Sequence, residues 1–215
     1  MSPPPPSNVQ GPATRERLLD AAEALFARQG SSSSLREITS AAGANLASVN
    51  YHFGSKEGLL RAVLGRRLDP INAARVTLLD RFEDEAPAGE PVPLERILEA
   101  FVRPTLDPEL DPGAHFFQLM AHLHASREPV AERFFQEVFE PLVKRFLGHF
   151  QAHRPDLTPA RLHARMHFVV GATIHAVLSQ LAPKCPLPEE LGPPLDREAL
   201  LTEVVSFCTA GFRHG

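Results

Sequence analysis

Apolar residues recur with helical spacing near the beginning of the chain. Between Thr14 and Gln29 they follow the series i, i+3, i+4, i+7, i+8 of an amphipathic helix, at Leu18, Ala21, Ala22, Leu25 and Phe26. Gly30 then suits the end of this helix, because glycine readily adopts the conformation found beyond a helix C-terminus. We therefore expect a first helix over this stretch.

Three more helices are predicted in quick succession. Ser34 and Glu37 have the spacing of a capping box, which predicts a second helix that begins at Leu35 and ends at Gly43. A third short helix fits Leu46–Phe53. Ser55 is placed to cap a fourth helix, whose expected inward positions are Leu59, Leu60, Val63, Leu64, Leu68 and Ile71.

The remainder of the chain repeats the helical pattern, and no run alternates with period two for long enough to be a strand. Acidic Asp84–Pro93 and proline-rich Pro183–Pro194 are expected to be loops, and Pro141 predicts a kink or an interruption inside a helical pattern. The other helices are expected over Leu94–Leu106, Gly113–Ser126, Val130–His153, Pro159–Leu181 and Arg197–Arg213. We therefore expect an all-α protein of about nine helices.

Three domains or segments follow from this pattern. Residues 1–12 are rich in proline and have no core-forming pattern, which favours a flexible or polyproline arm. The short helices of residues 13–60 are expected to form a small domain. Residues 61–215 are expected to form a larger helical domain.

Charge and composition indicate which partners and which compartment to expect. Residues 1–67 hold eight Lys and Arg against five Asp and Glu, a balance of +3, whereas the remainder holds fourteen against twenty-one, a balance of −7. Such asymmetry hints at a module that faces nucleic acid. The two cysteines, Cys185 and Cys208, are too few for a disulfide scaffold, and the longest apolar run, Phe168–Leu178, is too short to span a bilayer. We expect a soluble cytoplasmic protein without a membrane partner.

The predicted third helix has the composition of a helix that enters a DNA major groove. With Val49 directed inward, steps of about 100° per residue bring Leu46 and Phe53 to the same side. The outer side is formed or flanked by Ala47, Ser48, Asn50 and Tyr51. These side chains are compact and not acidic, and they offer hydroxyls and an amide to base edges or phosphates. Three short helices with a glycine in the turn favour a helix-turn-helix.

The run from Arg15 to Val63 resembles the DNA-binding domain of the TetR family of bacterial transcriptional regulators. The matching residues are Leu18-Leu19-Asp20-Ala21-Ala22, Leu25-Phe26, Gly30, Ile38, Ala41-Ala42-Gly43, Val49-Asn50-Tyr51-His52-Phe53 and Ser55-Lys56-Glu57-Gly58-Leu59-Leu60. The Tyr-His-Phe-x-x-Lys ending of the third helix is highly characteristic of that family. The helical remainder suits the family too, whose C-terminal half is usually a ligand-binding and dimerising domain.

The resemblance implies which residues meet DNA. Those expected to read or clamp it are Asn45, Ala47, Ser48, Asn50, Tyr51 and His52. Lys56, beside the N-terminus of the fourth helix, is expected to meet a phosphate, because a cation and free backbone N–H groups both favour an anion there. Arg36 is a further candidate for the DNA backbone. The wheel puts His52 near the inner face, so its predicted DNA contact depends on the family pattern and on its position at the helix C-terminus. The alternative for Tyr51 is a surface tyrosine that packs on its own domain.

The second half carries several faces rich in phenylalanine, which leave two interpretations open. They form either an ordinary core or an apolar cavity for a small effector, as the family usually has. Few charged residues interrupt these faces, so the effector is expected to be apolar or amphipathic, and the similarity of this half is to members that respond to fatty acids or acyl compounds. The expected lining residues are Phe117, Met120, Phe135, Phe139, Phe146, Met166, Val170 and Thr173.

The last two predicted helices are more apolar than the surface of a monomer. They are expected to pack against a second copy as a four-helix interface, which the resemblance also implies. The expected interface residues are Ile174, Val177, Leu178, Leu201, Val204, Val205, Cys208 and Phe212.

The sequence patterns also allow two other interpretations, a metal site and an enzyme. Of the ten histidines, His163 and His167 have metal-ligand spacing on one helical face, but no Cys-x-x-Cys or His-Glu-x-x-His run accompanies them, so we expect no metal and no cofactor. The alternative function is a small hydrolytic enzyme with an all-α fold. The chain lacks a Gly-x-Ser-x-Gly elbow, a phosphate-cradling glycine loop and a dinucleotide fingerprint, so we expect no enzyme.

These inferences predict a one-component regulator, most often a repressor in this family. Its homodimer is expected to bind a palindromic operator with two recognition helices about 34 Å apart. A small apolar effector would then release the protein by selecting a conformation that loses this spacing.

Overall fold

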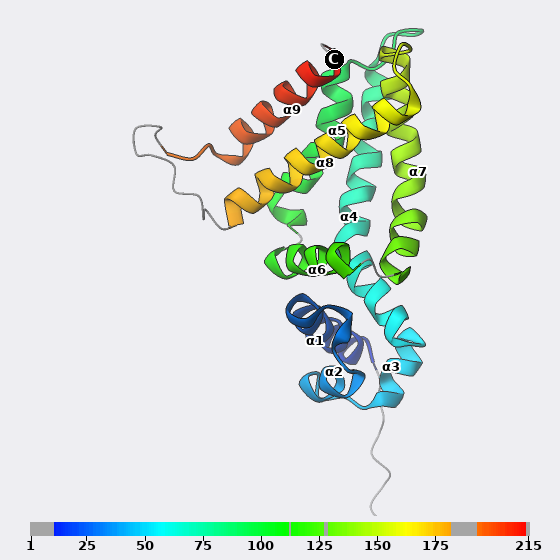
Figure 1. Cartoon of the computed structure of the whole chain (residues 1–215), viewed down its shortest axis with the longest axis vertical. Coiled ribbons are helices and arrows are strands. Elements are labelled where there is room, and N and C mark those ends of the chain that lie inside the picture. The colour runs from blue at the N-terminus through cyan, green and yellow to red at the C-terminus, as the bar shows by residue number, and fades with distance from the viewer. Residues whose placement is uncertain (1–10, 112, 127–128, 182–192, 214–215) are drawn as a thin grey trace, which may run out of the picture. The chain divides into compact units, whose positions relative to one another are not determined.

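The computed structural model describes residues 11–111, 113–126, 129–181 and 193–213. Most of the predicted arm over residues 1–12, most of the loop Pro183–Pro194, and Cys185 lie outside the described residues. Within the described ranges every regular element is helical, which confirms the all-α prediction (Figure 1). No helix of these ranges is long and apolar enough to cross a membrane.

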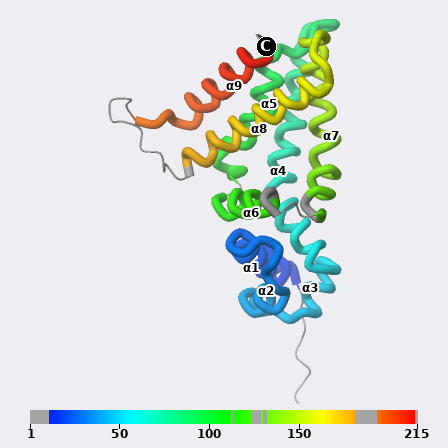
Figure 2. Tube along the Cα trace, in the orientation of Figure 1, coloured from blue at the N-terminus to red at the C-terminus, as the bar shows by residue number. Residues whose placement is uncertain are grey.

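The helices begin and end close to their predicted bounds. They are α1 (Pro12–Gln29), α2 (Leu35–Ala41), α3 (Leu46–Phe53), α4 (Lys56–Glu85), α5 (Leu94–Leu106), α6 (Gly113–Ser126), α7 (Pro129–His153), α8 (Pro159–Leu181) and α9 (Arg197–Arg213), with short 3-10 turns at Gly30–Ser32 and Pro108–Leu110. Pro141 interrupts no helix, and Pro70 and Pro104 also lie inside helices. Figure 2 follows the chain through these elements.

The described residues form two compact units, and neither is one continuous piece of sequence. The first contains residues up to Arg66 together with His115–Phe134, and the second contains Arg67–Ala114 and Phe135 onward. The first unit therefore includes a segment that the sequence pattern assigned to the C-terminal domain.

In the first unit, α1, α2 and α3 pack on one another. The apolar stripe of α1 faces α2 and α3, whose Ile38 and Val49 are fully buried. Arg66, at the end of this unit's part of α4, forms ion pairs with Asp20 and the buried carboxylate Glu23 of α1. Burial of apolar surface and this pair together fix α1 against α4.

In the second unit, α5 packs against α8 and α9, which also pack on each other. Its core is rich in phenylalanine, as the sequence predicts. Phe150 and Phe212 stack with ring centroids 4.3 Å apart, and Phe101 meets Phe146 edge to face at 5.2 Å. Outside the core, Glu83 of α4 accepts hydrogen bonds from Arg145 and pairs with His149 of α7.

Candidate nucleic-acid interface and effector region

The segment before α3 consists of a capped helix, α2, and a turn at Gly43. The N–H of Glu37 donates to Oγ of Ser34 over 3.2 Å, and the N–H of Ser34 donates to the Glu37 carboxylate over 2.8 Å, which confirms the predicted capping box of α2. The same contacts lower the pKa of Glu37, chiefly through the backbone hydrogen bond of Ser34. Gly43 follows α2 with φ of 58°, a conformation that glycine adopts without strain, and turns the chain toward α3.

Asn45 begins α3 as its N-cap. Its Oδ1 accepts from the N–H of Ser48 at 2.9 Å and from the Ser48 hydroxyl at 3.0 Å. The helical wheel places Ser48 beside the outer face, but Ser48 is only 3% exposed, because its hydroxyl points toward the Asn45 side chain. Leu46, expected to point inward, is 47% exposed, because it lies in the first turn of the helix.

The outer face of α3 otherwise lies where the sequence predicts. Ala47, Asn50 and Tyr51 are exposed, and Tyr51 leaves 73% of its surface free. Every residue of α3 is uncharged or basic. This face therefore presents a methyl group, an amide and a phenol without a carboxylate that would repel phosphate.

His52 differs from its neighbours. It is half-buried, and its Nε2 is enclosed without a hydrogen-bond partner among the described residues. Its ring meets the ring of Tyr51 edge to face with centroids 4.9 Å apart. The wheel, which put His52 near the inner face, describes its position better than the family pattern does.

The start of α4 fits closely against the end of α3. Oγ of Ser55 accepts from the N–H of Gly58 over 3.0 Å, as expected of a cap. A Cβ at Gly58 would lie 2.0 Å from the carbonyl oxygen of Phe53, so only glycine allows this approach. Lys56 is half-buried and donates through Nζ to the carbonyl of Ser31, whereas Arg36 on α2 is exposed. The first unit therefore offers the Arg36 guanidinium freely and holds the Lys56 ammonium against its own backbone.

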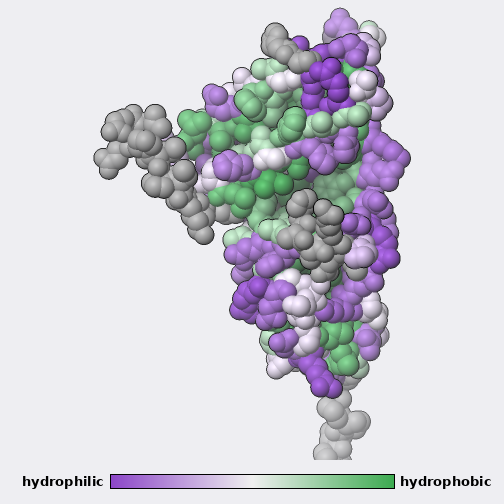
Figure 3. Space-filling view, viewed as in Figure 1, coloured by the Kyte–Doolittle hydropathy of each residue, from purple (hydrophilic) through white to green (hydrophobic). Residues whose placement is uncertain are grey.

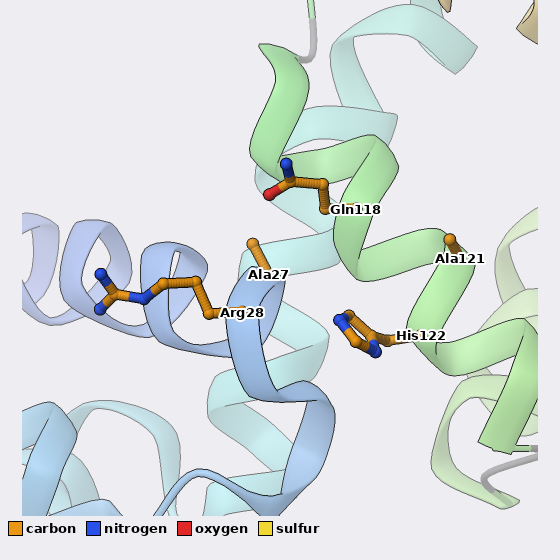
Figure 4. A pocket seen from close by; sticks show the side chains of 5 residues that line it. All are labelled: Ala27, Arg28, Gln118, Ala121 and His122. Atoms are coloured by element: carbon orange, nitrogen blue, oxygen red, sulfur yellow. The ribbon is translucent and has the colours of Figure 1, made fainter.

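Two of the eight predicted effector residues belong to the first unit. Phe117 of α6 packs edge to face on Phe116 at 5.5 Å, and Met120 is half-buried. An open hollow of about 520 Å³ lies between the C-terminal end of α1 and α6, lined by Ala27, Arg28, Gln118, Ala121 and His122 (Figure 4). In that view His122 reaches toward α1, and its Cβ would be 3.6 Å from a Cβ at Gly30. The hollow contains neither of the two predicted residues.

The other six predicted effector residues belong to the second unit. Phe135 and Phe139 meet on α7 at 5.7 Å, and Phe146 and Met166 are buried. Val170 is half-buried, and the hydroxyl of buried Thr173 donates to the carbonyl of Val169 over 2.8 Å. A separate groove of about 440 Å³ runs between α5 and α9, lined by Glu95, Glu99, Arg103, Leu201, Thr202, Val205, Ser206, Thr209, Ala210 and Arg213. Most of its lining residues are polar or charged, and none of the predicted effector residues is among them.

The predicted dimer residues divide into two groups. Ile174 and Leu178 on α8 are exposed and Val205 on α9 is half-buried, so a partner can reach them. The others are buried within the second unit itself and leave little surface for a partner: Val177, Leu201, Val204, Cys208 and Phe212.

Sequence reasoning left two larger apolar side chains out of the predicted interface. Phe168 of α8 and Phe207 of α9 are exposed, although each lies within an apolar run of its helix. Figure 3 shows apolar side chains over α8 and α9 on the face in view. We call Phe168, Ile174, Leu178 and Phe207 the apolar face of α8 and α9.

The histidines form no metal centre in the part of the chain that the structure describes, where no group of three His, Cys, Asp or Glu could hold an ion. His163 and His167 of α8 do lie together, with ring centroids 4.3 Å apart. Desolvation, and then the neighbouring His163, lower the pKa of His167.

Comparison with protein families gives two matches that divide the chain. Residues 18–63 match the family described as bacterial regulatory proteins, tetR family. Residues 99–211, more than half of the chain, match the tetracyclin repressor-like, C-terminal domain.

One curated relative and two solved structures extend the comparison. The HTH-type transcriptional dual regulator CecR of Shigella flexneri is 40% identical over 58 residues, which is 27% of this chain and 26% of CecR, so the match spans about a quarter of that relative. The fatty acid degradation regulator FadR of Bacillus halodurans has 16% identity and a TM-score of 0.58, with 92% of this chain and 99% of FadR covered. A proposed fatty acid metabolism regulator of Clostridium perfringens has 17% identity and a TM-score of 0.62, with 91% and 97% covered. Both structural likenesses concern the fold.

Proposed function

Because the chain belongs to the TetR family of bacterial regulatory proteins, we propose that it is a one-component transcriptional regulator that binds an operator through α3. The observation that carries this proposal is the outer face of α3, where Ala47, Asn50 and Tyr51 are exposed on a helix without acidic residues. A capped, rigidly held helix with such a face can enter a major groove and contact base edges.

The other predicted DNA contacts take more specific roles. Asn45 fixes the N-terminus of α3 and can reach DNA only with its amide nitrogen, since its oxygen is engaged by Ser48. The exposed Arg36 is suited to a phosphate, and Lys56 can reach one by leaving Ser31. Ser48 and His52 support the helix from its buried side in this proposal.

We further propose that the regulator acts as a homodimer formed through the apolar face of α8 and α9. Apolar side chains of this size on two adjacent helices are more stable when a second copy covers them. A symmetric dimer supplies two copies of α3, which a near-palindromic operator requires at a spacing of about one duplex turn.

The effector is proposed to bind within the second unit, where the half-buried Phe135 and Phe139 offer apolar surface on α7. An apolar or amphipathic ligand there would select a conformation that binds the operator less well, so the protein would act as a repressor in the cytoplasm. The names of the two structural neighbours, a fatty acid degradation regulator and a fatty acid metabolism regulator, agree with an acyl ligand. No turnover of substrate is expected in this role.

The test is binding of the purified full chain to duplex DNA from its own promoter region. We expect a retarded complex at low salt with the unchanged protein, and a loss of affinity of at least about tenfold for Tyr51→Ala, which removes an exposed side chain of the face. Gln136→Ala, an exposed residue of α7, is a matched surface control and should bind as the unchanged protein does. Absence of binding by a folded dimer, or equal binding by all three proteins, would refute the role given to α3.

A further inference from the structure

Arg75 of α4 is a buried arginine in the second unit. Only 6% of its surface is exposed, and its guanidinium lies over the ring of Phe101 on α5, 4.0 Å from the ring centroid. Nε donates to the carbonyl of Phe101 over 2.9 Å, and one terminal nitrogen donates to the hydroxyl of Thr105 over 2.8 Å. The other terminal nitrogen donates to Oδ1 of Asn72 over 2.9 Å. Every one of these acceptors is a neutral group.

No carboxylate of the described residues pairs with this cation. Arg75 makes no ion pair with a described residue, although ten other arginines of the described ranges do. Burial alone shifts the pKa of Arg75, and it lowers it to about 9, which leaves the guanidinium protonated at neutral pH. A buried charge without a counter-ion is costly, and proteins generally pair such charges.

The hydrogen bonds of Arg75 also leave donors unused. A guanidinium carries five N–H groups, and three of them are engaged here, so each terminal nitrogen keeps one. Beside it, Nδ2 of Asn72 is buried and has no partner among the described residues. The Asn72 nitrogen cannot donate to Arg75, because a guanidinium has no acceptor. Two donor groups without acceptors therefore lie next to each other in the interior.

The surroundings of these donors are apolar. The Phe101 ring that stacks on Arg75 also meets Phe146, one of the predicted effector residues, with centroids 5.2 Å apart. Phe101 and Phe146 are both fully enclosed. A ligand that places an anionic group on Arg75 and Asn72 would thus extend its remaining atoms among phenylalanine side chains.

We propose that Arg75 and Asn72 form a subsite for the carboxylate of an effector whose body is apolar. The carboxylate would accept from both terminal nitrogens of Arg75 and from Nδ2 of Asn72, and so supply the acceptor and the countercharge that no described residue provides. This inference rests on the proposed effector-responsive regulator and names the chemical class of its ligand, an amphipathic monocarboxylate.

The experiment compares two probes of equal chain length, octanoate and 1-octanol, by calorimetric titration of the full-length protein. The unchanged protein is expected to bind octanoate at least about tenfold more tightly than octanol, because charge-assisted hydrogen bonds are absent with the alcohol. Arg75→Met, which keeps the size of the side chain without its charge, should abolish this preference. Arg103→Met removes an arginine of α5 whose ion pairs lie at the surface, and it should keep the preference as a matched control.

A second variant keeps Arg75 and decides the matter if Arg75→Met does not fold. Asn72→Asp places a carboxylate beside the guanidinium, so it should raise the midpoint of thermal unfolding without ligand and remove the preference for octanoate. A preference that persists in Asn72→Asp, a lower unfolding midpoint in that variant, or octanoate binding no tighter than octanol in the unchanged protein would each overturn the proposal.

Promoter binding measured on the same samples separates this inference from the proposed function. A protein that binds its promoter but shows no octanoate preference would refute the subsite and leave the regulator standing. A protein that prefers octanoate but never binds DNA would refute the regulator and support the subsite.

Discussion

Replacing Phe207 by alanine tests the apolar face of α8 and α9 most directly. The side chain is 73% exposed on α9, so in a single chain it contributes little to the core. If a partner covers the exposed 73% of a phenylalanine surface of roughly 200 Å², a transfer free energy of about 25 cal/mol/Å² gives about 3.6 kcal/mol per copy. Alanine would still bury part of that surface, so the expected loss is about 2 kcal/mol per copy.

A symmetric dimer contains this substitution twice. The combined loss of about 4 kcal/mol corresponds to an increase in the dimer dissociation constant of several hundredfold. Sedimentation velocity over a range of protein concentrations measures that constant, and promoter binding should weaken in parallel because each operator needs two recognition helices.

Phe212→Ala is the matched control on the same helix. Phe212 is 1% exposed and stacks on Phe150 inside the second unit, so its loss should cost about 3–5 kcal/mol of folding free energy. Urea unfolding should detect this change, whereas Phe207→Ala should leave the stability of the separated chain within about 0.5 kcal/mol. A dimer as tight in Phe207→Ala as in the unchanged protein would refute the assignment of this face.

Four shorter predictions follow from the site. Asn45→Ala removes the cap of α3 and should cost about 0.5–2 kcal/mol with a matching loss of promoter affinity, whereas Asn45→Ser keeps a capping oxygen and most of the affinity; equal losses in fluorescence anisotropy would instead make Asn45 a base contact. Arg36→Ala should weaken binding to all duplexes alike and reduce the slope of log affinity against log salt by about one unit, and an unchanged slope would exclude a phosphate contact. Gly58→Ala forces a Cβ to within 2.0 Å of the Phe53 carbonyl and should destabilise the protein by about 1–3 kcal/mol in urea, while Gly148→Ala, with open space around its Cβ, should be neutral or stabilising; similar midpoints for both would contradict the close approach. Burial raises the pKa of the Cys208 thiol to about 11. In a Cys185→Ser background the folded protein should therefore react with an aromatic disulfide reagent at neutral pH only as it unfolds. Immediate reaction would place Cys208 at the surface.

The helices were predictable because local sequence signals mark their ends. Gly30 and the Ser34–Glu37 capping box mark the bounds of α1 and α2 locally, and the apolar spacing supplies the rest. Pro141 did not end its helix, because a proline within a long helix removes one hydrogen bond, and the packing of the neighbouring turns can maintain the helix on both sides. A helical wheel also could not predict the burial of Ser48, because that burial depends on a side-chain hydrogen bond to Asn45 rather than on periodicity.

The apolar faces were harder to interpret. A helical wheel tells which side chains share a face, but it does not tell what covers that face. Cys208 and Phe212 therefore looked like interface residues, although α5 and α8 cover them within the same chain. Arg75 lies four residues after Ile71 and four before Leu79, both buried, so its spacing places it on the inward stripe of α4, but an arginine is normally expected at the surface. Only tertiary packing shows that α5 encloses it.

The discontinuity of the first unit has a consequence for exchanging DNA specificity between relatives. Residues up to Arg66 do not complete this unit, because Arg133 pairs with Glu57 over 2.6 Å and Arg61 lies 5.8 Å from the ring centroid of Phe134. A chimera joined after Arg66 would bring foreign residues against this downstream segment and lose both contacts unless the segment travels with the head. Transplanting only the exposed side chains of α3 would alter the sequence that is read and leave the scaffold of the recipient intact.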